Sequence, residues 1–189
     1  MSAHSKMGNR AMPAQEKVTG LPELEKMIAD SPTPERVCLK LSQILRVERN
    51  EIALLRLEKG SLRFVYPTEL RSAGAIPLSG SAVAARTAAT RAPLLSNTFA
   101  RVKHVSLFET VKLGTGEESG RTEQMPIQKI ISVPVMDEEG IVLGVAQLSR
   151  KGLDSRLAGV DFTGEDLKQL ERAAKVIARM PFMQDGAPL

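Results

Sequence analysis

Several residue types that mark common functional sites are scarce in this chain. Its 189 residues include no tryptophan and one tyrosine, and aromatic residues make up only 3%. A surface that stacks single-stranded nucleic acid needs more aromatic side chains than this. Cys38 is the only cysteine, so an internal disulfide and a cysteine-based metal cluster are excluded. Its position in the apolar pattern of an expected helix predicts a buried, inert thiol.

Long apolar runs and runs of a single charge are missing as well. No apolar stretch approaches the length of about 20 residues that spans a bilayer, and the N-terminal residues lack the apolar core of a signal peptide. We therefore expect a cytoplasmic protein without a membrane partner. The formal net charge is +4, but no recognition motif accompanies it, which favours a solvated basic surface over nucleic-acid binding. The basic residues are scattered, and one loose group comprises Arg86, Arg91, Arg101, Lys103 and His104.

The remaining composition is that of one globular domain with polar ends. Apolar residues make up 42% of the chain and charged residues 25%, as in an ordinary folded domain. Residues 1–20 are small and polar without periodicity, which predicts a flexible leader. We expect a single domain over 21–182 and a tail at 183–189. Residues 112–125 hold almost no apolar anchor, so we expect a mobile loop there.

Three helices are indicated by capping signals and apolar periodicity. Thr33 can cap a helix that starts with a proline and continues with an apolar stripe. Thr163 predicts the cap of a final helix over 164–180, with acidic residues in its first turn. Between them, the alanine-rich segment 81–92 predicts a helix whose backbone can lie close to a sheet. The preceding Ser79-Gly80-Ser81 is a plausible cap for it.

Two hairpins are predicted from turn signals between apolar runs. The first turns at Lys59-Gly60, and the second spans 131–151 and turns at Asp137–Gly140. Pro134 lies within a strand of the second hairpin, where it cannot donate a ladder hydrogen bond. The strand after the turn is apolar on both faces, whereas a hairpin with one wet face should alternate. We therefore expect an antiparallel sheet with helices on both faces, and not a doubly wound parallel sheet.

Three segments together resemble a GAF domain, the small-molecule-sensing module of cyclic-nucleotide phosphodiesterases, phytochromes and bacterial regulators. They read IPLSGSAVAARTAATRAPLLSNTFARVKH, ISVPVMDEEGIVLGVAQLSRKG and DFTGEDLKQLERAAKVIARM, and the resemblance covers about residues 33–180. It implies a profilin-like α+β fold with a five- or six-stranded antiparallel sheet of order 2-1-5-4-3. The first and last helices cover one face, and the alanine-rich helix and the connection after it cover the other. The strand after the second turn is then central, and Pro134 lies beyond the end of a short neighbouring strand.

The resemblance places a ligand between the sheet and the segments after the second strand. In this chain the candidate binding residues lie at a helix start and on the covering segment, and they are Ser79, Gly80, Ser81, Asn97, His104 and Phe108. Exposed N–H groups at the helix start would favour an anionic group. The alternative is purely structural, with Ser79 a helix cap and Asn97 a turn residue.

The resemblance also bears on cofactors and catalysis. Some relatives hold haem on a histidine, but a single histidine in a basic stretch, as at His104, more often binds neither haem nor a metal. Bilin attachment uses a cysteine in the covering segment, which has none. The methionine-sulfoxide reductases of this fold use several cysteines, and the chain has no recognisable motif for paired carboxylates or a Ser-His-Asp site. We therefore expect a non-enzyme without haem, bilin or metal, whose ligand is unknown.

Relatives that bind cyclic nucleotides carry a motif of Asn-Lys, a distant Phe, and Asp-Glu. The matching positions here are Arg150-Lys151, Phe162 and Asp166-Leu167. Lys, Phe and Asp match, while Asn and Glu are replaced. The resemblance implies that Lys151 and Asp166 form a structural ion pair near the pocket, worth about 0–1 kcal/mol at a partly exposed position.

Two hypotheses follow for the function. The first is a stand-alone regulatory or sensory module that binds an unknown small molecule and signals through a homodimer or a separate effector protein. The terminal helices would form the dimer, because the last helix has a second apolar stripe at Ala173, Val176 and Met180. The second is a degenerate GAF domain that serves only dimerisation or protein interaction. Small residues such as Gly144 favour an open pocket, whereas Phe108 could fill it.

Cyclic AMP and cyclic GMP are expected to bind poorly, because the Asn and Glu of the motif are absent. Thermal-shift measurements check this, since a ligand at 100 times its dissociation constant stabilises a folded protein by about 2.7 kcal/mol. A clear shift with either nucleotide would contradict the prediction.

Overall fold

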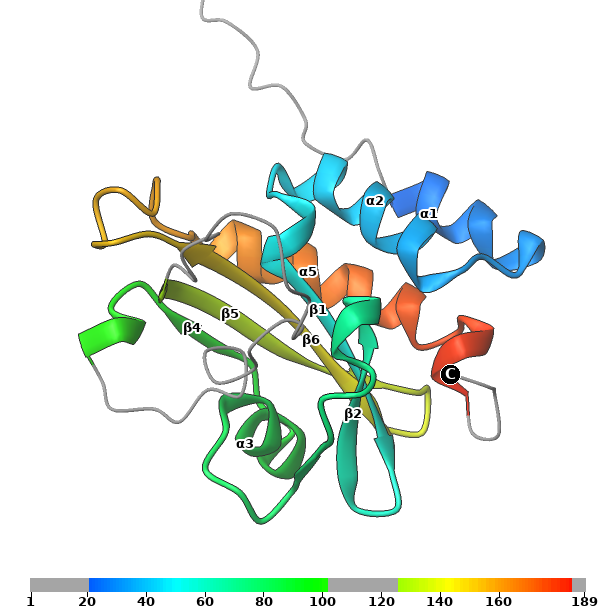
Figure 1. The fold of residues 1–189 in the computed structure, drawn as a ribbon. Coiled ribbons are helices and arrows are strands. Elements are labelled where there is room, and N and C mark those ends of the chain that lie inside the picture. Colours follow the sequence, from blue (N-terminus) through cyan, green and yellow to red (C-terminus); the bar gives the residue numbers. More distant parts are fainter. Residues whose placement is uncertain (1–20, 102–125, 185–189) are drawn as a thin grey trace, which may run out of the picture.

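The structure is a computed structural model, and it describes residues 21–101 and 126–184. The predicted leader at 1–20, the predicted loop at 112–125 and the tail beyond residue 184 lie outside the described residues. Figure 1 shows a sheet with helices on both of its faces. The helices are α1 (Leu21–Met27), α2 (Pro34–Leu45), α3 (Val83–Thr90) and α5 (Gly164–Ile177). The strands are β1 (Ile52–Glu58), β2 (Ser61–Tyr66), β3 (Ala75–Pro77), β4 (Leu94–Ser96), β5 (Ile127–Met136) and β6 (Val142–Lys151).

The strands form one six-stranded sheet in the order β3-β2-β1-β6-β5-β4, and neighbouring strands are antiparallel. Both predicted hairpins are present, as β1–β2 and β5–β6. The order differs from the predicted one in a single detail, the three-residue strand β3 at the outer edge of β2. Without β3, the other five strands take the predicted order 2-1-5-4-3, with β6 in the centre.

Helices on both faces explain why β6 is apolar on both sides. On one face, Leu41 of α2 and Leu170 of α5 join Leu148 of β6 in the larger apolar cluster, which α1 also enters. On the other face, Ala85 of α3 joins Val145 of β6 in a second cluster. Because alternate side chains of a strand point to opposite faces, β6 needs apolar residues at nearly every position.

Pro134 lies beyond the end of its short neighbouring strand, as predicted. β4 pairs only with residues 130–132 of β5, and its last contact in this direction joins Leu94 to Ser132. On the other side, Pro134 lies opposite Val145 of β6. A proline is tolerated where its missing N–H faces an open edge. Among the described residues, the last four residues of β5, 133–136, therefore have a strand partner only on the β6 side.

The capping predictions are confirmed for two helices and wrong for the third. The Thr33 side chain accepts from the Arg36 backbone N–H at 3.4 Å, and Thr163 forms a capping box with Asp166. The cap of α3, however, is Ala82, which offers no side-chain hydrogen bond. Residues 79–81 form a turn before it, because Gly80 N–H bonds back to the Pro77 carbonyl at 2.9 Å. The serines therefore come too early in the chain to cap α3.

The second apolar stripe of α5 does not face solvent. Ala173, Val176 and Met180 are all buried and belong to the same apolar cluster as Leu24 of α1. The chain's own first helix contacts α5, so a partner copy is not needed to cover the stripe. A homodimer through the terminal helices stays a prediction, but this stripe no longer supports it.

No helix within the described ranges 21–101 and 126–184 is long and apolar enough to cross a membrane.

Gly144 of β6 is closely packed between Leu55 of β1 and Met183, which follows α5. A Cβ atom there would lie 2.0 Å from the Leu55 carbonyl oxygen and 2.7 Å from the Met183 side chain. The idea that Gly144 leaves space for a ligand is therefore wrong, because Met183 from the segment after α5 covers it.

Replacing Gly144 with alanine is expected to lower the free energy of unfolding by about 3 kcal/mol, the upper end for overpacking, because one neighbouring atom is backbone. Urea denaturation checks this. Gly164→Ala is the matched control, since a Cβ at Gly164 meets no atom within 4 Å; it should change stability by less than about 0.5 kcal/mol. Equal unfolding midpoints for the two variants would contradict the prediction.

Candidate functional site

The candidate residues Ser79, Gly80 and Ser81 lie in the exposed turn between β3 and α3. Both serine side chains are exposed, and the Gly80 N–H is already bonded to Pro77. His104 and Phe108 lie outside the described residues. Among the described residues, no hydrogen bond joins this turn to Asn97.

Asn97 has a structural partner on both sides of its amide. Its Nδ2 donates to the Phe162 carbonyl oxygen at 2.9 Å, and its Oδ1 accepts from the Phe162 N–H at 2.9 Å. The residue after β4 is thereby fastened to the residue before the Thr163 cap of α5. Asn97 is therefore more than a turn residue, because its side chain holds two distant segments together.

The predicted ion pair between Lys151 and Asp166 is not among the ion pairs of the described residues, because each group is used elsewhere. Lys151 Nζ donates to the Asn50 carbonyl oxygen at 2.8 Å, and burial lowers the pKa of its ammonium group. The Asp166 carboxylate accepts from the backbone N–H and the hydroxyl of Thr163, at 2.7 and 2.8 Å. The structural ion pair between Lys151 and Asp166 stays a prediction from the family motif.

A different ion pair anchors the loop between β6 and α5. Lys129 of β5 lies 2.8 Å from the Asp161 carboxylate, and the Lys129 side chain is only 3% exposed. Its strand neighbour Arg150 stacks over the Phe162 ring, 4.6 Å from the ring centre. This is a cation–π geometry, so Arg150, which replaces the family's Asn, supports the loop.

A buried polar cluster lies between α3 and the centre of the sheet. Thr87 Oγ1 is 2.8 Å from Ser132 Oγ, and Gln147 Nε2 donates to the same oxygen at 3.1 Å. The exposed fractions of the three residues are 2%, 0% and 7%. Ser132 and Gln147 face each other across β5 and β6. This is the face on which the family resemblance places a ligand.

The side chains of the polar cluster hydrogen-bond one another within the chain. Among the described residues, the buried side-chain atom without a hydrogen-bond partner is Nε of Arg150, which lies outside this cluster. The hydroxyl groups of Thr87 and Ser132 can each donate or accept. Together they can hydrogen-bond a small polar molecule at the sheet. Sequence reasoning missed the cluster, although the period of two along β6 places Gln147 next to Val145 on the same face.

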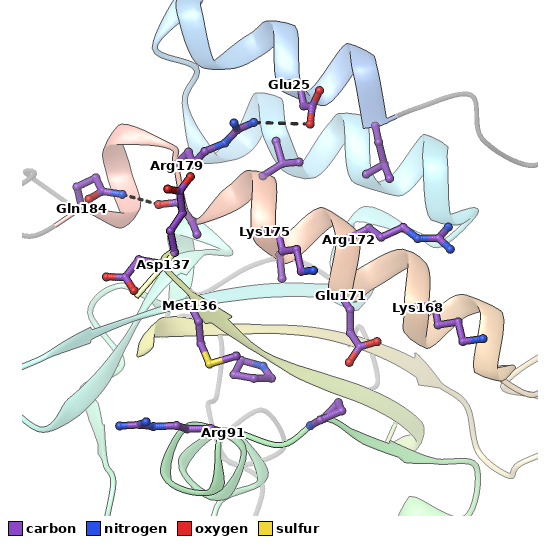
Figure 2. A pocket seen from close by; sticks show the side chains of 17 residues that line it. Glu25, Arg91, Met136, Asp137, Lys168, Glu171, Arg172, Lys175, Arg179 and Gln184 are labelled. Atoms are coloured by element: carbon purple, nitrogen blue, oxygen red, sulfur yellow. Dashed lines mark hydrogen bonds and ion pairs between the residues drawn. The ribbon is translucent and has the colours of Figure 1, made fainter. Parts of the chain in front are cut away.

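A concave region lies along α5, next to Pro134 and Met136 of β5. It is a groove with a volume of about 1060 Å³. Figure 2 shows α5 along one side, Arg91 on the opposite side, and Met136 between them. Sequence reasoning did not predict this groove, because it forms only where β4 ends and leaves part of β5 uncovered.

The described residues give little support to metal or thiol chemistry. They hold no group of three His, Cys, Asp or Glu side chains that could bind a metal ion. Cys38 of α2 is completely buried, as its apolar periodicity predicts. Burial raises the pKa of the Cys38 thiol well above its ordinary value. A thiol of this kind is a poor nucleophile, because the thiolate is the reactive form.

Comparison with known proteins identifies the family. The family profile of the GAF domain matches residues 35–180, most of the chain. The chain therefore belongs to the GAF family, whose members are generally sensory and regulatory modules. No curated protein matches it significantly in sequence.

Solved structures share the fold at low identity. The GAF domain of an Acinetobacter phosphoenolpyruvate-protein phosphotransferase is 13% identical with a TM-score of 0.60, over 87% of this chain and 92% of that one. A putative GAF sensor protein from Burkholderia vietnamiensis is 15% identical with a TM-score of 0.55, over 87% and 92%. A free methionine-R-sulfoxide reductase from Neisseria meningitidis is 16% identical with a TM-score of 0.58, over 94% and 95%. The fold therefore occurs in both sensors and enzymes.

Replacing Asn97 with alanine is expected to lower the free energy of unfolding by about 1–3 kcal/mol, because the Phe162 backbone groups lose their partners. Urea denaturation measures the change. Asn97→Asp keeps the side-chain acceptor but loses the N–H donor, so its free energy of unfolding should lie between those of the wild type and of Asn97→Ala. The exposed neighbour provides the control variant Thr98→Ala, which should be close to neutral. If Asn97 acted only on a ligand, its removal would leave the stability of the free protein unchanged.

Proposed function

We propose that this chain is a sensory or regulatory module that binds a small molecule on the α3 face of its sheet. The observation that carries the proposal is the buried, hydrogen-bonded cluster of Thr87, Ser132 and Gln147. The opposite face of β6 has Ala146 and Leu148 at the neighbouring positions, within a large apolar cluster. Polar side chains at the centre of one face of the sheet are expected where a ligand needs hydrogen bonds of fixed direction.

The proposed ligand is a small, polar metabolite with at least one hydrogen-bond donor. The donor would pair with Gln147 Oε1, and the two hydroxyl groups would complete the contact. The Neisseria relative is described in complex with its substrate, which supports a small molecule as the ligand of this fold.

The proposal assigns the chain a regulatory and not a catalytic role. The buried Cys38 offers no accessible thiolate, unlike the cysteine chemistry that the resemblance associates with the reductases. The module would transmit its signal through a homodimer or a separate effector protein. A cytoplasmic location is part of the same proposal.

One observation favours the second candidate function, a module for association only. Ala84, Ala85 and Ala88 of α3 pack into an apolar cluster with Leu55 and Phe64. This part of the α3 face is filled by the chain's own side chains. If the filling extends to Gln147, no ligand has access and the domain only binds proteins.

Substituting Gln147 with leucine separates the two functions. The change keeps the approximate shape of the side chain but removes its amide, while Ser132 keeps Thr87 as a partner. Stability without ligand should change by less than about 1.5 kcal/mol, as for other substitutions of similar volume. A thermal-shift screen with a metabolite panel should then give hits with the wild type that Gln147→Leu loses.

The control for this screen is Gln169→Leu on α5, which makes the same chemical change away from the α3 face and should keep every hit. Native mass spectrometry of the purified protein adds the mass of any ligand that it carries. A panel without hits, together with no carried ligand, would contradict the sensory proposal and favour association only.

A further inference from the structure

The groove beside α5 follows an unpaired edge of the sheet. β4 ends opposite Ser132, so residues 133–136 of β5 have no strand on that side among the described residues. The groove lies along this edge, and Pro134 and Met136 form part of its wall. In Figure 2, Glu171 and Lys175 point from α5 towards this strand, and Arg91 lies across from them. No strand of the described residues borders this space, in which Met136 is partly exposed and Pro134 is buried.

The groove has the length of a short peptide. Its helical side runs from Lys168 of α5 to Arg179 in the turn just after that helix, which corresponds to about 16 Å at the helical rise of 1.5 Å per residue. An extended chain covers that length with about five residues. The volume of about 1060 Å³ is at the upper limit for a small-molecule pocket, which is typically about 300–1,000 Å³.

The cations along the groove differ in whether they have a partner. Arg172 lies 3.6 Å from the Glu165 carboxylate and Arg179 lies 3.7 Å from that of Glu25. The other three cations of the groove are Arg91, Lys168 and Lys175. Within the described ranges none of these three has an ion pair, so they are available to an anionic partner.

The acidic residues of the groove do not cancel these charges. The Asp137 carboxylate accepts from two N–H groups of its own turn, Glu139 at 3.0 Å and Ile141 at 2.8 Å. Besides the paired Glu25, this leaves Glu138 and Glu171. Three cations without an ion pair therefore face two acids, and they flank an uncharged wall of proline and methionine.

We propose that this groove is a docking site for an extended peptide segment of a partner protein that carries acidic side chains. Its carboxylates would pair with Lys168, Lys175 and Arg91, and its apolar side chains would contact the partly exposed Met136. The chain's edge proline limits backbone pairing with other strands, so the selectivity comes from side chains and charge. The site is separate from the proposed ligand face under α3.

Fluorescence anisotropy tests the proposal with a labelled eight-residue peptide of alternating valine and glutamate. Peptides with glutamine or lysine in place of glutamate are the comparison probes. The acidic peptide should bind the wild type at least about tenfold more tightly than either, because an ion-pair difference of about 1.4 kcal/mol corresponds to a factor of ten. Added salt should weaken its binding, since exposed charges are screened.

The double variant Lys168→Glu/Lys175→Glu should weaken acidic-peptide binding by at least about tenfold. The control is Arg36→Glu/Lys59→Glu, which changes the net charge equally at exposed positions outside the groove and should have little effect. Backbone amide signals of the wild type should shift at 136–138 and 168–175 on binding. Equal losses in both double variants, equal binding of the glutamine peptide, no binding, or shifts elsewhere would each overturn the proposal.

Discussion

The burial of the middle of β6 on all sides is the constraint on which the rest of the structure depends. β6 has a strand on either side and helices over both faces, so residues 144–149 are buried, while both ends of the strand are partly exposed. Apolar residues meet that requirement without further conditions, whereas polar ones need partners. The same constraint requires glycine at 144, where the segment after α5 contacts the sheet. Gln147 and Ser149 are the buried polar residues of β6, and both side chains form hydrogen bonds within the chain.

The two faces of the sheet are built differently. Three helices and a large apolar cluster cover one face, and the burial of this apolar surface is the main source of stability. The other face has the eight-residue helix α3, small alanine side chains and a polar centre. Because the apolar face secures the fold, the α3 face can carry buried polar groups. The groove at the open edge is a third region, outside both clusters.

Much of the fold could be predicted from local patterns, but the site could not. Hairpin turns and the caps at Thr33 and Thr163 depend on neighbouring residues, so the sequence reveals them directly. The partner of Asn97 depends on which segments meet in space, so the sequence alone does not reveal it. The apolar stripe of α5 predicts an interface, because periodicity does not tell whether a helix of the same chain covers it. The polar cluster combines three elements, and only their register brings Thr87, Ser132 and Gln147 together.

The paired hydrogen bonds of Asn97 connect regions that would otherwise be independent. Asn97 follows the edge strand next to the α3 face, whereas Phe162 immediately precedes the helix that borders the groove. Neither residue can move alone without losing both bonds. A molecule that displaces the end of β4 must therefore either break this connection or move the start of α5 with it. Asn97 thus provides a short mechanical coupling between the α3 face and the groove, the kind of contiguous contact through which binding energy at one location can alter another.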